Sequence, residues 1–436
     1  MRDIKPNILF ITTHDLGQHM GCYGQTTVST PNLDRLAGQG VRFASSFTTS
    51  PTCSPSRSAL HTGRYSHANG IMGLAGKVHG WSYRPGERHF VWRAKEAGYK
   101  TALVGVQHVA LDAAELGYDE VYPLCPAGQL KEQAGHVLRR LCGDGPPFYL
   151  EVGFFEPHRP YDFGGAGPDE RSGVAVPGYL PNTSEARKEM AAVQGAIRAM
   201  DEAVGHLLSE LDRTGQADRT WVIFTTDHGL AMPRAKSTLY DPGIETALLM
   251  RWPGAGVIGG RVLEEMISNV DIVPTMLEAI GVPISPEVQG ISFWPLLCGE
   301  MYQARSEIFA EKTFHTQYEP MRAIRTERHK LIVNLELGPK INVPSDIQLG
   351  PLFPQMIEQC VNARSKVELF DLATDPLEMT NLVDKPEYAS LRGELTGRLL
   401  EWMAKTGDPI LQGPIASSYY KEALELLRSG QPVSRS

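Results

Sequence analysis

A cysteine and an arginine four residues apart, in the run CSPSR at residues 53–57, form the most specific chemical pattern of this sequence. A cysteine side chain can supply a nucleophile or a metal ligand. If a helix begins here, Arg57 lies one turn beyond Cys53, where its permanent positive charge can neutralise negative charge that develops on a substrate. The five other cysteines are scattered and form no CxxC pair, which predicts reduced and mostly buried thiols.

Polar side chains also gather directly after several apolar runs. In an open sheet of parallel strands, ligands bind just beyond the carboxyl ends of the strands. Histidines and carboxylates at such positions are therefore candidates for one common site, although each taken alone is more often a solvated or structural residue. The clusters are His14-Asp15, His108, Glu156-Pro157-His158 and Asp227-His228.

Short apolar runs alternate with helical patterns and position these clusters. The alternation predicts an α/β fold in which a mostly parallel sheet is sandwiched by helices. The predicted strands are residues 7–12, 99–106, 147–155 and 220–226, and the predicted helices are residues 31–37 and 184–211.

The pattern changes after about Glu300. We expect an N-terminal catalytic domain of residues 1–302 and a smaller C-terminal α+β domain of residues 303–436 that carries an antiparallel sheet. The elements predicted for the second domain are strands at residues 321–335 and 366–372, a helix at residues 388–403 and a long surface loop at residues 338–354.

Composition and charge exclude some classes of function. The 436 residues carry a net charge of -8, which provides no basic surface for nucleic acid. No apolar run approaches the roughly 18 residues of a membrane span. The first residues lead straight into the strand at residues 7–12 without a signal-peptide core or cleavage site. We therefore expect a cytoplasmic protein, with a trimmed secreted form as the alternative, and leave the oligomeric state open.

The run at residues 53–57, followed by Thr62-Gly63-Arg64, resembles the signature of the type I sulfatases of the alkaline phosphatase superfamily, Cys-x-Pro-x-Arg trailed by Thr-Gly. The resemblance covers nearly the whole chain and is greatest to the sulfamidase-like members, for example at Pro157-His158-Arg159. It implies an alkaline-phosphatase-like fold and conversion of Cys53 to formylglycine by a separate formylglycine-generating enzyme. A hydrated aldehyde has two hydroxyls on one carbon, so one can attack sulfur and the other can then expel sulfate.

The same resemblance implies one divalent metal ion, held by His14, Asp15, Asp227, His228 and the modified Cys53. His14 stands where the family usually has an acid. Calcium prefers oxygen ligands, whereas two imidazoles with two carboxylates favour manganese or zinc. We expect Ca²⁺ first, with Mn²⁺ or Zn²⁺ as alternatives. The other interpretation of His14 is a histidine that hydrogen-bonds a metal ligand without contacting the metal.

Three further positions match functional residues of the family. His108 corresponds to a histidine that supports formylglycine and can act as the base that triggers its collapse. His158 corresponds to a proton donor near the leaving group. Lys236 corresponds to a basic residue that binds sulfate. With Cys53 and Arg57, these residues complete the catalytic set that the resemblance implies.

One position departs from the family pattern: Val106 stands where a lysine usually bridges nucleophile and sulfate. Either another cation, such as Arg64 or Lys77, supplies the missing charge, or turnover is reduced. His315 and Arg322 open the C-terminal domain and are candidates to reach over the pocket, although a polar strand on a solvated face is the more ordinary interpretation of both.

The leading hypothesis is a hydrolase of sulfate esters or sulfamates that acts on a small anionic substrate, with glycosaminoglycan-derived sugars such as N-sulfoglucosamine among the candidates. A phosphonate or phosphate diester hydrolase on the same scaffold is the second hypothesis, because sulfuryl and phosphoryl centres are both tetrahedral and oxygen-rich. Val106 removes positive charge, which favours the less charged sulfuryl group. A non-catalytic protein that binds sulfated glycans is the third hypothesis.

Overall fold

An eight-stranded sheet forms the centre of the protein in the computed structural model, which describes residues 5–76, 79–143 and 145–430. Its strands are β1 (Asn7–Thr13), β2 (Val41–Phe43), β4 (Lys100–Gly105), β5 (Glu120–Tyr122), β6 (Phe148–Gly153), β7 (Thr220–Thr226), β8 (Leu248–Arg251) and β9 (Arg261–Leu263). They follow the order β5-β4-β6-β1-β7-β8-β2-β9. Most neighbours pair in parallel, and of the described strands in this sheet only β8 runs antiparallel to both of its neighbours. The predicted, mostly parallel sheet is therefore confirmed.

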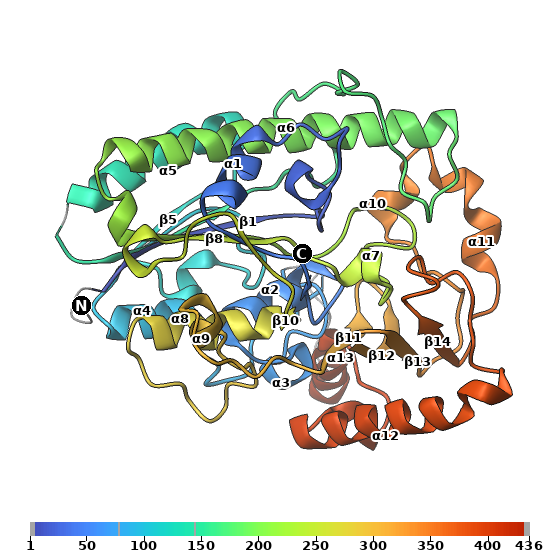
Figure 1. Cartoon of the computed structure of the whole chain (residues 1–436). Helices are drawn as coiled ribbons and strands as arrows, with labels where there is room; N and C mark the ends of the chain where they lie inside the picture. The colour runs from blue at the N-terminus through green and yellow to red at the C-terminus, as the bar shows by residue number, and fades with distance from the viewer. Residues whose placement is uncertain (1–4, 77–78, 144, 431–436) are drawn as a thin grey trace.

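Helices cover both faces of this sheet, as Figure 1 shows. One face carries α1 (Pro31–Gln39), α5 (Ala127–Gly143) and the long α6 (Ser184–Arg213). The opposite face carries α2 (Cys53–Thr62), α4 (Phe90–Glu96) and α8 (Ile272–Ala279). The helices predicted near residues 31–37 and over residues 184–211 are thus present as α1 and α6.

The sequence of β1 shows why this strand lies at the centre. Successive side chains of a strand point to opposite faces. Leu9 and Ile11 pack into the core on the α6 face, whereas Ile8 and Phe10 pack into the core on the α2 face. All seven residues of β1 are buried, so an unbroken apolar run is required rather than an alternating one.

A second sheet of four antiparallel strands follows, as expected for the C-terminal part. Its strands are β11 (Glu307–Phe314), β12 (Tyr318–Thr326), β13 (His329–Asn334) and β14 (Val367–Asp371). The helix α12 (Ala389–Thr406) packs on it through Leu395, Leu399 and Trp402. The single strand predicted for residues 321–335 is two strands, because the chain reverses at residues 327–328 and pairs β12 with β13.

The surface loop predicted at residues 338–354 is only partly right, because most of the stretch is irregular but it does not lie wholly on the surface. This stretch contains α10 (Ser345–Gln348) and is followed by α11 (Ile357–Val361), and most of its large apolar side chains are buried, although Leu349 is 88% exposed. Ile341, Val343 and Ile347 join the same core cluster as α6. Burial of these side chains outweighs the Pro and Gly content from which a loop was predicted.

The division into domains of residues 1–302 and 303–436 stays a prediction. Within the part of the chain that the structure describes, no helix is both long enough and apolar enough to cross a membrane.

Candidate active site and metal centre

The two central strands deliver the first four site residues. Thr13 of β1 and Thr226 of β7 are partners in the parallel register. The residues that follow them, His14-Asp15 and Asp227-His228, therefore emerge side by side at the carboxyl edge of the sheet. The backbone N–H groups of Asp15 and His228 both donate to Oδ1 of Asp227, over 3.0 and 2.9 Å. Asp227 thus ties the two loops together.

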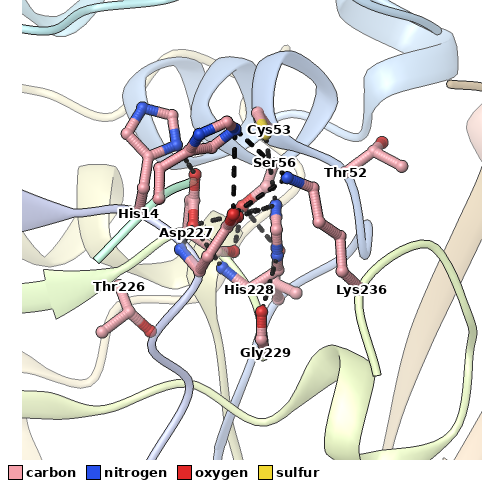
Figure 2. A network of polar contacts seen from close by, with 12 residues as sticks. His14, Thr52, Cys53, Ser56, Thr226, Asp227, His228, Gly229 and Lys236 are labelled. Carbon is pink, nitrogen blue, oxygen red and sulfur yellow. Dashed lines mark hydrogen bonds and ion pairs between the residues drawn. The ribbon is translucent and has the colours of Figure 1, made fainter. Parts of the chain in front are cut away.

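Cys53 is the first residue of α2, and its side chain points into the same place. Its Sγ lies 3.3 Å from Nε2 of His228, and the residue is 2% exposed. One ligand atom each from His14, Asp15, Cys53 and Asp227 lies within 4.8 Å of the others. Figure 2 shows Cys53 at the start of its helix, close to His14 and His228. The sequence-predicted nucleophile and metal loops therefore meet.

Arg57 holds α2 against these loops. Its guanidinium donates from Nε to Oδ2 of Asp227 (3.2 Å), from Nη1 to Oγ1 of Thr12 (3.2 Å) and from Nη2 to the carbonyl of Thr13 (3.1 Å). The residue is completely buried. A planar group with several fixed donors suits this role better than a lysine ammonium. Arg57 thereby fixes the distance between Cys53 and the metal loops.

The hydrogen bonds of His228 show which of its nitrogens faces the site. Nδ1 lies 3.0 Å from the carbonyl of Gly229, an acceptor, so Nδ1 carries a proton and donates. In the neutral ring Nε2 is then a lone pair, and it lies 3.3 Å from Oδ1 of Asp15. A lone pair and a carboxylate oxygen repel each other unless a cation or a proton lies between them. Such an outer hydrogen bond is typical of histidines that bind metals.

Two buried polar atoms at the site have no hydrogen-bond partner among the described residues: Nδ1 of His14 and Oδ1 of Asp15. Nδ1 of His14 lies 3.0 Å from Oδ2 of Asp227, but in a geometry that makes no hydrogen bond. Burial, followed by the positive charge of Arg57, lowers the pKa of His14 to about 4, so its ring is neutral at pH 7. Two buried atoms that can ligate a metal and have no hydrogen-bond partner are compatible with a divalent cation between them.

Lys236 and His158 lie on the other side of Asp15. The ammonium of Lys236 donates to Oδ2 of Asp15 over 2.9 Å and lies 3.3 Å from Nε2 of His158. Burial alone would raise the pKa of Asp15, but the positive charge of Lys236, above all, outweighs it and places that pKa well below its usual range. His158 donates from Nδ1 to the carbonyl of Arg159, which leaves Nε2 facing the site. Figure 2 shows Lys236 reaching in from a separate loop.

His108 completes the group from the end of β4. Its ring centroid lies 5.8 Å from that of His14, and one nitrogen of each ring lies within 4.8 Å of the other and of Cys53 Sγ. Burial, chiefly, lowers the pKa of His108 to about 3. Its backbone adopts a left-handed conformation with φ of 57°. The structure therefore brings together the predicted metal ligands and the predicted catalytic set, which are His14, Asp15, Cys53, Arg57, His108, His158, Asp227, His228 and Lys236.

A model of the sulfatase family matches residues 6–282, which is more than half of the chain. The chain belongs to the sulfatase family. A second model, described as the C-terminal part of N-sulphoglucosamine sulphohydrolase, matches residues 228–340. Membership makes this protein a hydrolase of sulfuric esters or sulfamates.

Individual relatives agree with this membership. Human N-sulphoglucosamine sulphohydrolase is 29% identical, over 94% of this chain and 92% of its own. A sulfatase structure, yidJ of Bacteroides fragilis, superimposes with a TM-score of 0.76 at 22% identity and covers 94% of this chain and 98% of its own. A structure solved with its substrate D-glucosamine-2-N,6-O-disulfate has a TM-score of 0.69 at 20% identity, over 94% and 99% of the two chains. The expected alkaline-phosphatase-like fold is thus confirmed.

Neither candidate for the charge missing at Val106 is shown to replace it in this sulfatase. Arg64 pairs instead with Glu87 (3.0 Å) and Glu287 (3.6 Å). Lys77 lies outside the described residues. The cations that the structure does place at the site are Lys236 and Arg57.

Of the two further C-terminal candidates, only His315 lies near the site. Burial and the charges of Lys236 and Lys312 lower the pKa of His315 well below its usual range. Arg322 is completely buried and donates to Asp408 and to the carbonyl of Lys312. The expectation that Arg322 reaches over the pocket or lies on a solvated face is therefore wrong, because an ion pair in the core holds it.

Sequence reasoning missed one charged residue of the site. Asp346 on α10 accepts a hydrogen bond from Lys236 at Oδ2 (3.0 Å) and lies 3.9 Å from Nε2 of His158. It belongs to the stretch that was predicted to be a surface loop. The available signal was the apolar spacing around it, since Ile341, Val343 and Ile347 are all buried.

Proposed function

We propose that this sulfatase cleaves the sulfate ester or sulfamate of a sugar, with a formylglycine made from Cys53 as nucleophile and one divalent cation beside it. The observation that carries the proposal is the position of Cys53. Its Sγ lies 3.3 Å from His228 and within 4.8 Å of ligand atoms of Asp15 and Asp227. An oxidised side chain at this position lies against both carboxylates, which is what the chemistry requires.

The residues that would hold the cation are His14, Asp15, Asp227, His228 and the modified Cys53. When bound, a divalent cation supplies Lewis acidity that polarises a sulfuryl oxygen and lowers the pKa of a nucleophilic hydroxyl. The proposed ligands include two imidazole rings. Burial keeps the ring of His14 neutral, and Nδ1 of His228 donates to the carbonyl of Gly229, which leaves Nε2 of His228 to face the site. Imidazole suits manganese and zinc better than calcium, so the donors support Mn²⁺ or Zn²⁺ over the Ca²⁺ that family resemblance favours.

Charged residues of the chain itself would bind the sulfate. Lys236 lies buried beside Asp15, where a sulfuryl oxygen that approaches the nucleophile meets its ammonium. Arg57 is already engaged by Asp227 and two threonines, so its charge acts through Asp227 and the helix it anchors. Both charges lie in a site with little water, where they stabilise negative charge more strongly than in solution.

Two histidines would move the protons. Nε2 of His158 faces the site beside Lys236 and has no proton while the ring is neutral, because Nδ1 donates to the carbonyl of Arg159. The side chain is 21% exposed, so Nε2 can take up a proton from solvent and pass it to the departing oxygen or nitrogen. A ring nitrogen of His108 lies within 4.8 Å of Sγ of Cys53. This position suits His108 to remove the proton whose loss expels sulfate from the nucleophile. Both roles require a ring that changes its charge during the cycle, and burial holds both rings neutral at rest.

A sulfated amino sugar is the substrate class that we propose. The human relative is named for N-sulphoglucosamine, and one structural neighbour was solved with a disulfated glucosamine. Both names describe those proteins, and they support rather than define the substrate of this chain.

The test is production of the protein with a formylglycine-generating enzyme, followed by mass spectrometry of the Cys53 peptide. We expect the aldehyde at residue 53, and turnover of 4-nitrophenyl sulfate and N-sulfo-D-glucosamine that is absent in Cys53→Ala. A phosphonate monoester assayed in parallel distinguishes the second hypothesis, and faster turnover of that ester would replace the proposal. A wholly unmodified Cys53 in fully active protein would also refute it.

A further inference from the structure

Asp346 places a negative charge in a site that we propose binds an anionic sulfate group. Its Oδ2 accepts a hydrogen bond from Lys236, the cation that we propose for sulfate binding, over 3.0 Å. Together with Asp15 and His158 it forms a group whose ligand atoms lie within 4.8 Å of one another. A negative charge at this place weakens sulfate binding by repulsion, so its presence calls for a compensating function.

The chain fixes Asp346 in place. The next residue, Ile347, is 1% exposed and packs into the α6 core together with Leu352. The backbone N–H of Leu352 donates to Oε2 of Glu189 on α6 over 3.0 Å. Nε2 of Gln348, the last residue of α10, donates to the carbonyl of Val343, which precedes the helix, over 2.7 Å. Asp346 is therefore presented from a docked element, which a residue that recognises a substrate requires.

One oxygen of Asp346 remains free to meet a ligand. Oδ2 is engaged by Lys236, whereas Oδ1 makes no hydrogen bond or ion pair with the described residues. The side chain is 22% exposed, so Oδ1 can be reached from the pocket. An ionised carboxylate only accepts hydrogen bonds, so the group that meets it must be a donor.

The position of Asp346 indicates which part of the substrate supplies that donor. His158, 3.9 Å away, is the residue that faces the leaving group in the proposed reaction. A sugar presents hydroxyl or amino N–H groups on the ring carbons next to the scissile bond. Charge-assisted hydrogen bonds from such donors are stronger than neutral ones and require matching geometry.

We infer that Asp346 is a specificity-determining residue that accepts hydrogen bonds from hydroxyl or amino donors on the sugar next to the bond that is cleaved. It selects a sugar leaving group with a free donor at that position and disfavours one that carries a second sulfate there, because two anions then face each other. This inference rests on the proposed function and names the leaving group of the same reaction.

The experiment compares Asp346→Asn and Asp346→Ala with the wild type on two substrates. N-sulfo-D-glucosamine offers donors next to the scissile bond, whereas 4-nitrophenyl sulfate offers none. We expect kcat/KM for the sugar to fall roughly 50-fold, and kcat/KM for the aryl sulfate to change by less than about threefold. Glu358→Gln is the matched control, because Glu358 is an exposed carboxylate on the following helix, α11. It should leave both substrates unaffected.

Product inhibition provides a second measurement that a purely structural role would not reproduce. With 4-nitrophenyl sulfate as reporter, we expect Asp346→Asn to raise the inhibition constant of D-glucosamine about tenfold and to lower that of inorganic sulfate, because one repulsive charge is gone. An equal loss on both substrates, with unchanged glucosamine inhibition, would overturn the inference and make Asp346 a residue that merely positions Lys236. A wild type that cleaves the aryl sulfate but not the sugar would also overturn it. A wild type without any sulfatase turnover would instead refute the proposed function.

Discussion

Nε2 of His228 lies 3.3 Å from Sγ of Cys53, although the two residues are 175 positions apart in the chain. The contact exists because α2 begins at Cys53 directly above the carboxyl ends of β1 and β7 (Figure 2). The proposed nucleophile at the start of a helix and a histidine of the proposed metal site at the end of a strand are thereby held together by the sheet rather than by a local turn. The predictions for Arg57, His14 and Lys236 all depend on Cys53 and His228 meeting at this one site.

Arg57→Lys should cost roughly 100-fold in kcat/KM although the charge is kept. A lysine cannot donate to Asp227, Thr12 and Thr13 at once, so α2 loses its fixed distance from the metal loops. Steady-state turnover of 4-nitrophenyl sulfate checks this. Arg219→Lys, at an exposed position, is the control and should be neutral. Full activity of Arg57→Lys would show that charge alone suffices.

Metal preference should depend on His14. The wild type, stripped with a chelator and dialysed against equal Ca²⁺, Mn²⁺ and Zn²⁺, should retain Mn²⁺ or Zn²⁺, because His14 and His228 offer nitrogen donors. His14→Asp replaces one of these by carboxylate oxygen and should shift retention toward Ca²⁺. Elemental analysis of the dialysed protein measures both. Exclusive retention of Ca²⁺ by the wild type would contradict the argument.

The central sheet and the site residues on it were predictable because their signals are local. Unbroken apolar runs such as the one preceding His14 mark strands that are buried on both faces, and the polar residue that follows marks the carboxyl end. Parallel pairing of β1 with β7 then brings Asp15 and Asp227 together without further information. Resemblance to the sulfatases added the role of Cys53.

The apolar spacing around Asp346 could have indicated that its segment is buried, but the position of Asp346 beside Lys236 was not predictable, because it depends on tertiary docking. The segment around it has only short helices, and its burial comes from side chains such as Ile347 that pack against a distant part of the chain. The expectation about Arg322 was wrong for a related reason. Its ion pair with Asp408 joins residues 86 positions apart, and no local sequence pattern predicts such a pair. The periodic spacing of apolar residues carries no information about which charged residues pair over long distances in the sequence.

Lys236→Met should raise KM for sulfate esters and lower kcat/KM by roughly 100-fold. The ammonium is buried between Asp15 and Asp346, so its loss also leaves two carboxylates facing each other without a shared cation. Inhibition by inorganic sulfate should weaken in parallel. Lys188→Met on the exposed side of α6 controls for loss of a lysine. Unchanged sulfate inhibition would remove Lys236 from the sulfate site.

Acid should destabilise the protein partly through His19. Burial alone lowers the pKa of His19 to about 4, below its ordinary value of 6.5. The unfolded chain therefore binds a proton near pH 6.5 that the folded state refuses until about pH 4, and stability falls as the pH drops through this window. Between pH 7 and pH 5, His19→Gln should remove about 2 kcal/mol of that loss. Urea unfolding at pH 7 and pH 5 measures it, and an unchanged pH dependence would refute the assignment.

Docking of the segment that carries Asp346 should be measurable as stability. Ile347 is 1% exposed and lies in the core beside α6, so Ile347→Ala removes three carbons' worth of packing and leaves a cavity. We expect a loss of about 2–4 kcal/mol in the free energy of unfolding. Ile357→Ala is the matched control, because Ile357 is 42% exposed and its truncation should cost under about 0.5 kcal/mol.

The same pair of variants separates packing from recognition. If the segment docks as the structure shows, Ile347→Ala loosens α10 and lowers turnover of N-sulfo-D-glucosamine more than turnover of 4-nitrophenyl sulfate, because Asp346 loses its fixed position. Chemical denaturation and the two assays, run on one preparation, test both consequences together. Equal stability of the two alanine variants would mean that residues 341–352 do not contribute to the core, and the placement of Asp346 would then lose its physical basis.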